Sequence, residues 1–420
     1  MSEAPGITVT NHTRVPRAFG PRVLMPGVPT VVPPSFLQDW GPNAPGLRYD
    51  YSRMPELLRM LDDDGVPVID WCSPLSMSEG YGRHAIWIIR ALLERGVNVG
   101  VHDVGWVTGD WVPGDIQDRR RQAYRDLPAR IGVAMTLGYD PHLVMVSSPI
   151  RIGITQFETN RLPRVHVDNV NQLDHVLVTS KFGIKMFRHS GVRSPIALMR
   201  PGIPSHEFPY HERPMDGLFK VLVLGALTQR KNPVGAVRIF KRASQGNPDW
   251  RLTVKTRLAA PEVQREIGDD SRIRLVVSNE PPNRVLQWYH AHDCFLWPSK
   301  GEGVGLPPLE AMATGMELVC AEHSGMADYV DEEICYPIKT AGMETARTDD
   351  GFNWKYIQSY GEVGEWWVPD EDHAVRQLRR CFNNWRSGRR RGKHASEVVA
   401  TKFPIHNSAD DLIAVLKEYA

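Results

Sequence analysis

Two glutamates, Glu302 and Glu310, have a type and spacing that suggest chemistry. They lie in the stretch 299–315, SKGEGVGLPPLEAMATG, where glycine and proline fill most of the intervening positions. A carboxylate can accept two hydroxyl donors at once, which suits the diols of sugars and riboses. The glycines let a ligand come close to the backbone. For a bare pair of glutamates, the alternative is one solvated charge in a loop and another on a helix surface.

The residues around these glutamates predict how they are placed. CFLWPS is typical of a strand, GEGVG of a turn, and PPLEAMATG of a helix with proline in its first turn, where proline is tolerated. In an open parallel sheet, ligands bind beyond the carboxyl ends of the strands, where a helix N-terminus offers N–H groups to an anion. We therefore expect Glu302 in the loop and Glu310 about one turn into the helix, both facing one cleft.

A pair of cations has a similar position earlier in the chain. Arg230 and Lys231 belong to GALTQRKNP, residues 225–233, which follows the strand-like run FKVLVL and opens a helix. Cations held in such a position stabilise negative charge that develops on a leaving phosphate. We interpret the pair as part of an anion site, with two solvated loop charges as the alternative.

Two segments of the N-terminal half supply further candidates. In SEGYGRHA, residues 78–85, Gly80 and Gly82 permit a tight turn and the close approach of a phosphate, although a glycine turn is also common without function. In QFETNRLPRVHVDN, Glu158 either orients an acceptor hydroxyl or caps a loop. We expect His166, in the same segment, to be structural.

Strand and helix patterns alternate along most of the chain and predict an α/β fold. VPVIDWCS, a glycine turn, the helix HAIWIIRALLERG and the strand VNVGVHDV form one βαβ unit, and HLVMVSS, HVLVTS and SPIALM are further predicted strands. A second series begins at FKVLVLGAL. The expected domains are an N-terminal arm or small β appendage (1–50), two Rossmann-like domains (51–205 and 217–369) and a C-terminal helical tail (370–420).

Composition narrows the class of protein. The 420 residues carry a formal net charge of +1, which excludes a broadly basic nucleic-acid binder. No apolar run approaches the roughly 18–20 residues of a transmembrane helix and no signal sequence is visible, so we expect a cytoplasmic protein. Five scattered cysteines form no CxxC pair. The acidic runs 62–64 and 370–372 are interpreted as solvated charges, and no catalytic metal is expected.

The C-terminal segment 374–393 is strongly basic. Its apolar residues have helical spacing, and no acidic residue separates its cations. A packed helix with a solvated basic face, a contact with an anionic membrane surface and a contact with DNA all fit this pattern. The apolar residues are Val375, Leu378, Phe382 and Trp385, and the cations are Arg376, Arg379, Arg380, Arg386, Arg389, Arg390, Arg391 and Lys393.

The stretch from Glu302 to Glu310 resembles the glutamate–seven residues–glutamate signature of retaining GT-B glycosyltransferases of group 1, the glycogen-synthase-like and mannosyltransferase-like class. The resemblance covers roughly residues 66–335 and is strongest over 219–335. It implies a GT-B architecture, in which two Rossmann-like domains face each other across a cleft. It also implies that a nucleotide sugar is the co-substrate, bound mainly by the C-terminal domain, with no further cofactor and no metal.

The resemblance assigns roles to particular residues. Glu310 would hold the ribose hydroxyls of the donor, and Glu302 would contact hydroxyls of the transferred sugar. One departure from the family is Ala226, where many relatives carry an arginine, so the arginine role would fall to Arg230 beside Lys231. Backbone groups near the sugar and the diphosphate would come from Gly82, Gly225, Gly303, Val304, Gly305 and Leu306.

The implied reaction is metal-independent transfer of a sugar to an acceptor hydroxyl with retained anomeric configuration. The acceptor stays open. Residues 1–50 resemble short β appendages of bacteriophage proteins, which together with the basic tail raises the hypothesis of a phage enzyme that glycosylates hydroxymethylated pyrimidines in DNA. A nucleotide-sugar epimerase of GT-B shape and an inactive sugar-nucleotide binding module are the alternatives from other classes.

Overall fold

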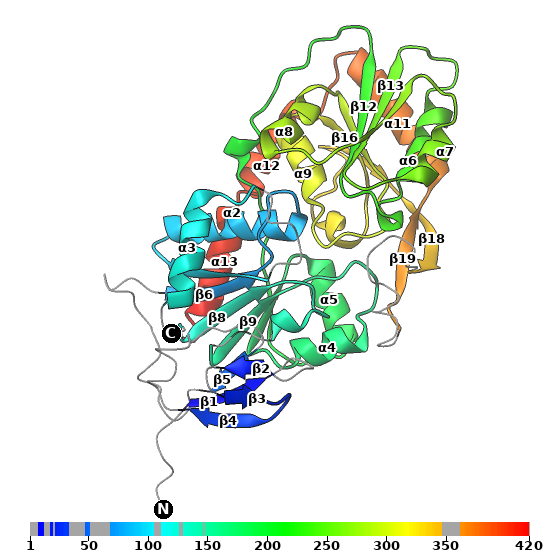
Figure 1. Ribbon diagram of the computed structural model, residues 1–420. Coiled ribbons are helices and arrows are strands. Elements are labelled where there is room, and N and C mark those ends of the chain that lie inside the picture. The colour runs from blue at the N-terminus through cyan, green and yellow to red at the C-terminus, as the bar shows by residue number, and fades with distance from the viewer. Residues whose placement is uncertain are drawn as a thin grey trace, which may run out of the picture.

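The computed structural model describes residues 7–11, 17–19, 22–32, 47–50, 68–104, 111–125, 129–144, 146, 148–346 and 362–419. The acidic run 62–64 and the helix expected around it lie outside these residues. Figure 1 shows two α/β domains facing each other, with a small β structure below the first of them. No helix in the described part of the chain is both long and apolar enough to cross a membrane.

The first domain is built on a six-stranded parallel sheet in the order β11-β10-β9-β8-β6-β7. Its strands are short apolar runs, as expected for a parallel sheet covered by helices. The strands are β6 (Val68–Ser73), β7 (Asn98–Asp103), β8 (Ile131–Met135), β9 (Ile150–Ile154), β10 (His175–Val178) and β11 (Ile196–Leu198). The helices are α2 (Gly80–Glu94), α3 (Gly114–Arg125), α4 (Arg164–Val170) and α5 (Lys181–His189).

One strand prediction in this domain is wrong. HLVMVSS begins in a short 3-10 turn, Pro141–Leu143, and the sheet instead takes its strands from IGVAM before it and IRIGI after it. The apolar side chains of Leu143 and Val146 are buried in a hydrophobic cluster, so burial rather than strand pairing explains the apolar character of the segment.

The second domain repeats the plan with a parallel sheet in the order β14-β13-β12-β15-β16-β17. Together the two sheets confirm the predicted α/β class. The strands are β12 (Phe219–Leu224), β13 (Trp250–Thr256), β14 (Ile273–Val277), β15 (Cys294–Trp297), β16 (Glu317–Ala321) and β17 (Tyr336–Ile338). The helices are α6 (Pro233–Ala243), α7 (Pro261–Ile267), α8 (Pro282–His290) and α9 (Leu306–Ala313).

The C-terminal helices are shared between the domains. Helix α11 (Glu371–Arg386) packs against α6 and β17, and α12 (Gly392–Lys402) packs against α9 of the same domain. The chain then returns to the first domain, where α13 (His406–Leu416) packs against α2. At the crossing, the Ile203 N–H donates to the Phe403 carbonyl at 3.0 Å. The region predicted as a helical tail therefore belongs to the body of both domains.

A two-stranded ribbon connects the domains at a second place. Strands β18 (Thr340–Thr345) and β19 (Glu365–Pro369) pair antiparallel and extend from the second domain toward α4 and α5 (Figure 1). The Asn160 N–H of the first domain donates to the Glu365 carbonyl at 3.2 Å. Trp366 is buried in a hydrophobic cluster made mainly of first-domain residues.

The described N-terminal residues form small β structures, with a three-stranded sheet in the order β4-β1-β5 and a β2-β3 hairpin. These strands are β1 (Ile7–Asn11), β2 (Arg17–Phe19), β3 (Arg22–Leu24), β4 (Pro29–Val32) and β5 (Leu47–Asp50).

The basic C-terminal segment is largely a packed helix. Trp385 of α11 is 3% exposed, and its indole N–H donates to Asp293 at 3.3 Å. Its ring lies 5.2 Å from that of Phe219, between centroids. Several cations of the segment bind the protein itself: Arg379 donates to the Ala243 carbonyl and Arg390 to the Arg213 carbonyl.

We predict that Trp385→Ala lowers the free energy of unfolding by about 3–5 kcal/mol, because it leaves a cavity between α11 and the second sheet and leaves Asp293 without the indole donor. The exposed neighbour is the control, since Arg386→Ala should change the free energy by no more than about 0.5 kcal/mol. Urea denaturation followed by circular dichroism measures both. Equal effects would mean that α11 does not pack as described.

Candidate active site

A cavity of about 250 Å³ lies where the carboxyl ends of the two sheets face each other. Both domains line it, because each sends the loops that follow its strands toward the other. From the first domain, the polar lining includes Glu79, Tyr81, Arg83, His84, Gln156 and Glu158. From the second, it includes Arg230, Lys231, Lys255, Arg257, Glu280, Trp297 and Glu302.

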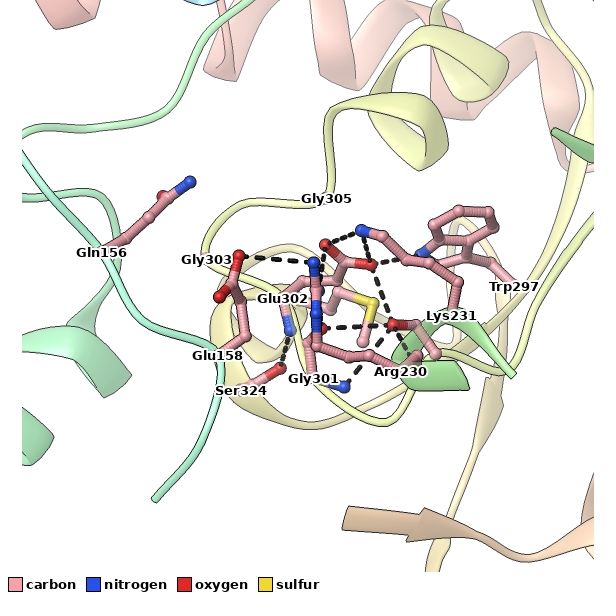
Figure 2. A network of polar contacts seen from close by, with 12 residues as sticks. Gln156, Glu158, Arg230, Lys231, Trp297, Gly301, Glu302, Gly303, Gly305 and Ser324 are labelled. Atoms are coloured by element: carbon pink, nitrogen blue, oxygen red, sulfur yellow. Dashed lines mark hydrogen bonds and ion pairs between the residues drawn. The ribbon is translucent and has the colours of Figure 1, made fainter. Parts of the chain in front are cut away.

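Glu302 is the centre of a polar network in this cavity (Figure 2). Its carboxylate is 2.5 Å from the Lys231 ammonium through both oxygens, and it accepts hydrogen bonds from the Ser299 hydroxyl at 2.8 Å and the Trp297 indole at 3.1 Å. One oxygen also lies 3.3 Å from the Arg230 guanidinium. With so many donors, the carboxylate holds the two cations in fixed positions.

The loop that carries Glu302 needs glycine for two different reasons. Gly305 has a left-handed backbone (φ 82°), and a Cβ there would meet the Tyr329 hydroxyl at 2.5 Å. Gly301 lies so close to the Glu158 carbonyl of the first domain that a Cβ would overlap with it. The Glu302 N–H is itself held by the Ser324 hydroxyl at 2.9 Å. The loop is therefore fixed by its own domain and fitted against the other.

The two cations come from a turn between β12 and α6. Asn232 takes a left-handed conformation (φ 52°), which asparagine tolerates, and the helix begins at the following proline, Pro233. The Lys231 ammonium lies 5.2 Å above the centre of the Trp297 ring. The Arg230 guanidinium lies 3.4 Å from a carboxylate oxygen of Glu158, which belongs to the first domain.

Burial and charge set the protonation of this cluster. Burial raises the pKa of Glu302, but Lys231 and Arg230 outweigh it and hold that pKa below its ordinary value. Burial, reinforced by the neighbouring Arg230, lowers the pKa of Lys231 to about 8 despite the carboxylate. Near neutral pH these three residues are therefore charged and together carry one positive charge. Glu158 of the first domain neutralises that charge in this structure.

Glu310 is buried in α9 and does not line the cavity. It accepts a hydrogen bond from the Tyr289 hydroxyl at 2.7 Å, and its other oxygen lies 2.5 Å from the guanidinium of Arg83, in α2 of the first domain. Burial raises the pKa of Glu310, and Arg83 acts in the opposite direction.

The structure thus brings most of the sequence-predicted residues to one place. Glu158, Gly225, Val304, Gly305 and Leu306 line the cavity with the charged cluster, whereas the predicted Gly82 and Gly303 do not.

The two glycines outside the lining have packing roles. Gly82 lies inside the first turn of α2, rather than in a turn before it, and a Cβ there would meet the Ser76 N atom at 2.5 Å. A Cβ at Gly303 would overlap with the Gln156 side chain of the first domain, and the Gly303 carbonyl accepts a hydrogen bond from the Thr179 hydroxyl at 3.2 Å.

Sequence reasoning missed several residues of the site. Arg83 stands directly after Gly82 in the SEGYGRHA motif, and Trp297 ends the strand before the glutamate loop. Both could have been suspected as site residues from the sequence, because each lies beside residues that were predicted to belong to the site. Gln156, which lines the cavity two residues before Glu158, had no distinguishing pattern.

Among the residues that the structure describes, no group of three or more histidine, cysteine, aspartate or glutamate side chains is placed to bind a metal ion. The acidic run 370–372 has structural contacts instead. Asp370 accepts from the His373 N–H at 2.8 Å at the start of α11, and Asp372 pairs with Arg242.

The pKa of about 8 for Lys231 predicts a pH dependence of anion binding. As the pH rises through this value, the ammonium loses its proton and its attraction for a diphosphate. The affinity for UDP, used as a test diphosphate, should therefore fall by roughly tenfold between pH 7 and pH 9. Isothermal titration calorimetry across this range measures it, with Lys231→Arg as the matched variant whose charge does not titrate there. A fall of the same size in that variant would mean that another group causes it.

Comparisons with known proteins show what the second domain is similar to. Residues 219–348 match the family Glycosyl transferases group 1. The chain is 34% identical to the lipopolysaccharide core biosynthesis mannosyltransferase LpsB of Rhizobium meliloti over 90 residues. This aligned region covers 20% of this chain and 25% of that protein. The chain is 35% identical to the D-inositol 3-phosphate glycosyltransferase of Corynebacterium efficiens over 141 residues. This aligned region covers 31% of each protein. The chain thus matches about a quarter to a third of the length of these relatives.

Similarity to solved structures extends over both domains. Sucrose-phosphate synthase from Thermosynechococcus elongatus superposes with a TM-score of 0.60 at 15% identity, covering 84% of this chain and 98% of that one. Alr3699/HepE from Anabaena, solved in complex with UDP and glucose, superposes with a TM-score of 0.57 at 13% identity, covering 83% and 100%. The chain therefore has the GT-B fold, and residues 219–348 of its second domain are similar to the group 1 glycosyltransferases.

Proposed function

We propose that this protein is a retaining glycosyltransferase that moves a sugar from a nucleotide-sugar donor to an acceptor hydroxyl without a metal ion. The observation that carries the proposal is the cluster of Arg230, Lys231 and Glu302 at the carboxyl edge of the second sheet. It lies in a cavity that the first domain closes from the other side.

The donor would bind with its diphosphate at the two cations. As the glycosidic bond breaks, negative charge develops on the departing phosphate, and Arg230 and Lys231 lie where they would stabilise it. A uridine nucleotide is the first candidate, because structural neighbours of this chain were solved with UDP or UDP-glucose. The same two cations would take the role that a metal ion has in other transferases.

The charge pattern also supports a mechanism without a separate general base. Glu302 is saturated by donors, and its pKa is held below its ordinary value, so it is a weak base. Burial, with Arg83, lowers the pKa of His84 to about 4. In a retaining reaction of this kind, the acceptor hydroxyl attacks on the face that the leaving group departs from, and the departing phosphate oxygen takes its proton. Closure of the two domains would keep water from competing for the donor.

The first-domain wall supports an acceptor that places an apolar face against it. Its apolar lining comes from Met77, Met135, Leu137 and Phe157, beside Tyr139.

The other acceptors considered from the sequence gain less support. The hypothesis of a DNA or anionic-membrane contact rested on the basic C-terminal segment, and part of that charge is used internally. Arg391, for example, donates to the Cys335 carbonyl and lies 4.3 Å from the centre of the Tyr336 ring. Transfer to hydroxymethylated pyrimidines in DNA stays a hypothesis that labelled hydroxymethyl-containing DNA would test.

We predict that Lys231→Ala lowers the rate of UDP-sugar turnover by about 10²–10³-fold, because the leaving diphosphate loses one of its two cations. Release of UDP from a panel of UDP-sugars, by transfer or by slow hydrolysis, measures the rate. Lys220→Ala, which removes a lysine paired with Asp216 outside the cavity, is the matched control and should leave the rate unchanged. Full activity in Lys231→Ala would refute the site, and no turnover by the wild type would favour an inactive binding module.

A second prediction concerns metal ions. Turnover should be unchanged by EDTA, because protein cations hold the diphosphate. The measurement is the same UDP-release assay after dialysis against the chelator, with and without added Mg²⁺ or Mn²⁺. A loss of activity that either ion restores would contradict the metal-independent part of the proposal.

A further inference from the structure

The residue expected to hold the ribose is covered by the other domain. Glu310 has an exposed fraction of 0%, and the cavity is lined by Arg83 rather than by Glu310 itself. The Arg83 side chain is 14% exposed, and its guanidinium lies 2.5 Å from Glu310 and 5.1 Å from the centre of the Trp87 ring. Arg83 therefore stands between the cavity and the buried carboxylate.

The expected diphosphate ligand is covered in the same way. Arg230 lies 3.4 Å from Glu158, a carboxylate that the first domain extends across the cavity. A third pair of the same kind joins Glu79 of the first domain to Arg257 of the second. Three ion pairs therefore cross between the domains around one cavity.

The signs of these charges match the parts of a nucleotide. A carboxylate on Arg230 occupies the place of an anionic phosphate. A guanidinium that donates to Glu310 occupies the place of ribose hydroxyls, which are also donors. The cavity that remains, about 250 Å³, is smaller than the roughly 300–1,000 Å³ that pockets for ligands of this size usually have.

We propose that Arg83 and Glu158 compete with the nucleotide for its binding residues. In the closed state that the structure describes, these two side chains occupy the nucleotide site. Donor binding replaces Arg83 by the ribose at Glu310 and Glu158 by the diphosphate at Arg230. The inference rests on the proposed function, since it takes Glu310 and Arg230 as nucleotide ligands. It predicts that binding begins with separation of the domains around the cavity.

The exchange explains why a buried carboxylate is tolerated without a ligand. An unpaired charge in the interior is costly, and breaking a buried pair by removing one partner leaves that cost in place. Arg83 supplies the missing charge in the free protein. Molecules in which these contacts are formed cannot bind the nucleotide. The apparent affinity for the nucleotide is therefore reduced to the fraction of molecules in which the contacts are open.

The test is the affinity and association rate of UDP for Arg83→Met and Glu158→Gln. Methionine keeps an apolar stem against Trp87 without the charge. Each variant should bind UDP more tightly than the wild type, by about 5- to 150-fold, and associate faster. Arg90→Met is the matched control, because Arg90 lies in the same helix and pairs with Asp115 away from the cavity. Its affinity should equal that of the wild type.

The outcomes separate this inference from the proposed function. Equal or weaker UDP binding by Arg83→Met, with the wild type binding, would overturn the competition and make Arg83 a ligand or a structural residue. Circular dichroism checks folding, and Arg83→Gln replaces the methionine variant if that one does not fold. Binding by the variants but not by the wild type would support the inference strongly. No binding of UDP or turnover of any nucleotide sugar by wild type or variants would instead reject the proposed function.

Discussion

The contact between the Lys231 ammonium and the Glu302 carboxylate is the interaction on which the site depends. A lysine taken out of water loses solvation energy that only a nearby opposite charge and good hydrogen bonds can offset. Here the carboxylate touches the ammonium with both oxygens, and Ser299 and Trp297 donate to the same group. The pair stays charged near neutral pH and holds a cation at the edge of the sheet.

The rest of the fold serves to bring this pair to a surface shared by two domains. The turn after β12 delivers the cations, and the loop after β15 delivers Glu302 on a path that glycine alone can follow at position 305. The crossing at Ile203 and the β18–β19 ribbon connect the domains at two separate places. Opposite charges from the first domain then complete the cluster. The charges of the site are therefore balanced without a ligand. An anionic ligand must replace the first-domain carboxylate to bind there.

Residues of this site could be predicted from the sequence where local structure positions them, and not where the packing of the two domains does. Glu302 and Lys231 could be found because each follows a recognisable strand by a few residues, and local geometry carries both to the same sheet edge. Arg83 could not be assigned a role, because its partner Glu310 belongs to the other domain and only the packing of two domains brings them together. The strand predicted at HLVMVSS was wrong for a related reason. Composition could report burial there, but only the sheet order shows that β8 and β9 fill the places beside β6 and β10.

The central claim is that a nucleoside diphosphate binds at Arg230 and Lys231. The most direct measurement is a thermal unfolding scan of the wild-type protein with UDP, GDP, ADP, CDP and TDP. A ligand that binds only the folded state stabilises it by mass action, by about 2.7 kcal/mol at a hundred times its dissociation constant. We expect a clear rise of the unfolding midpoint with one of the five, UDP being the first candidate. No change with any of them at millimolar concentration, in the wild type and in Arg83→Met alike, would contradict it.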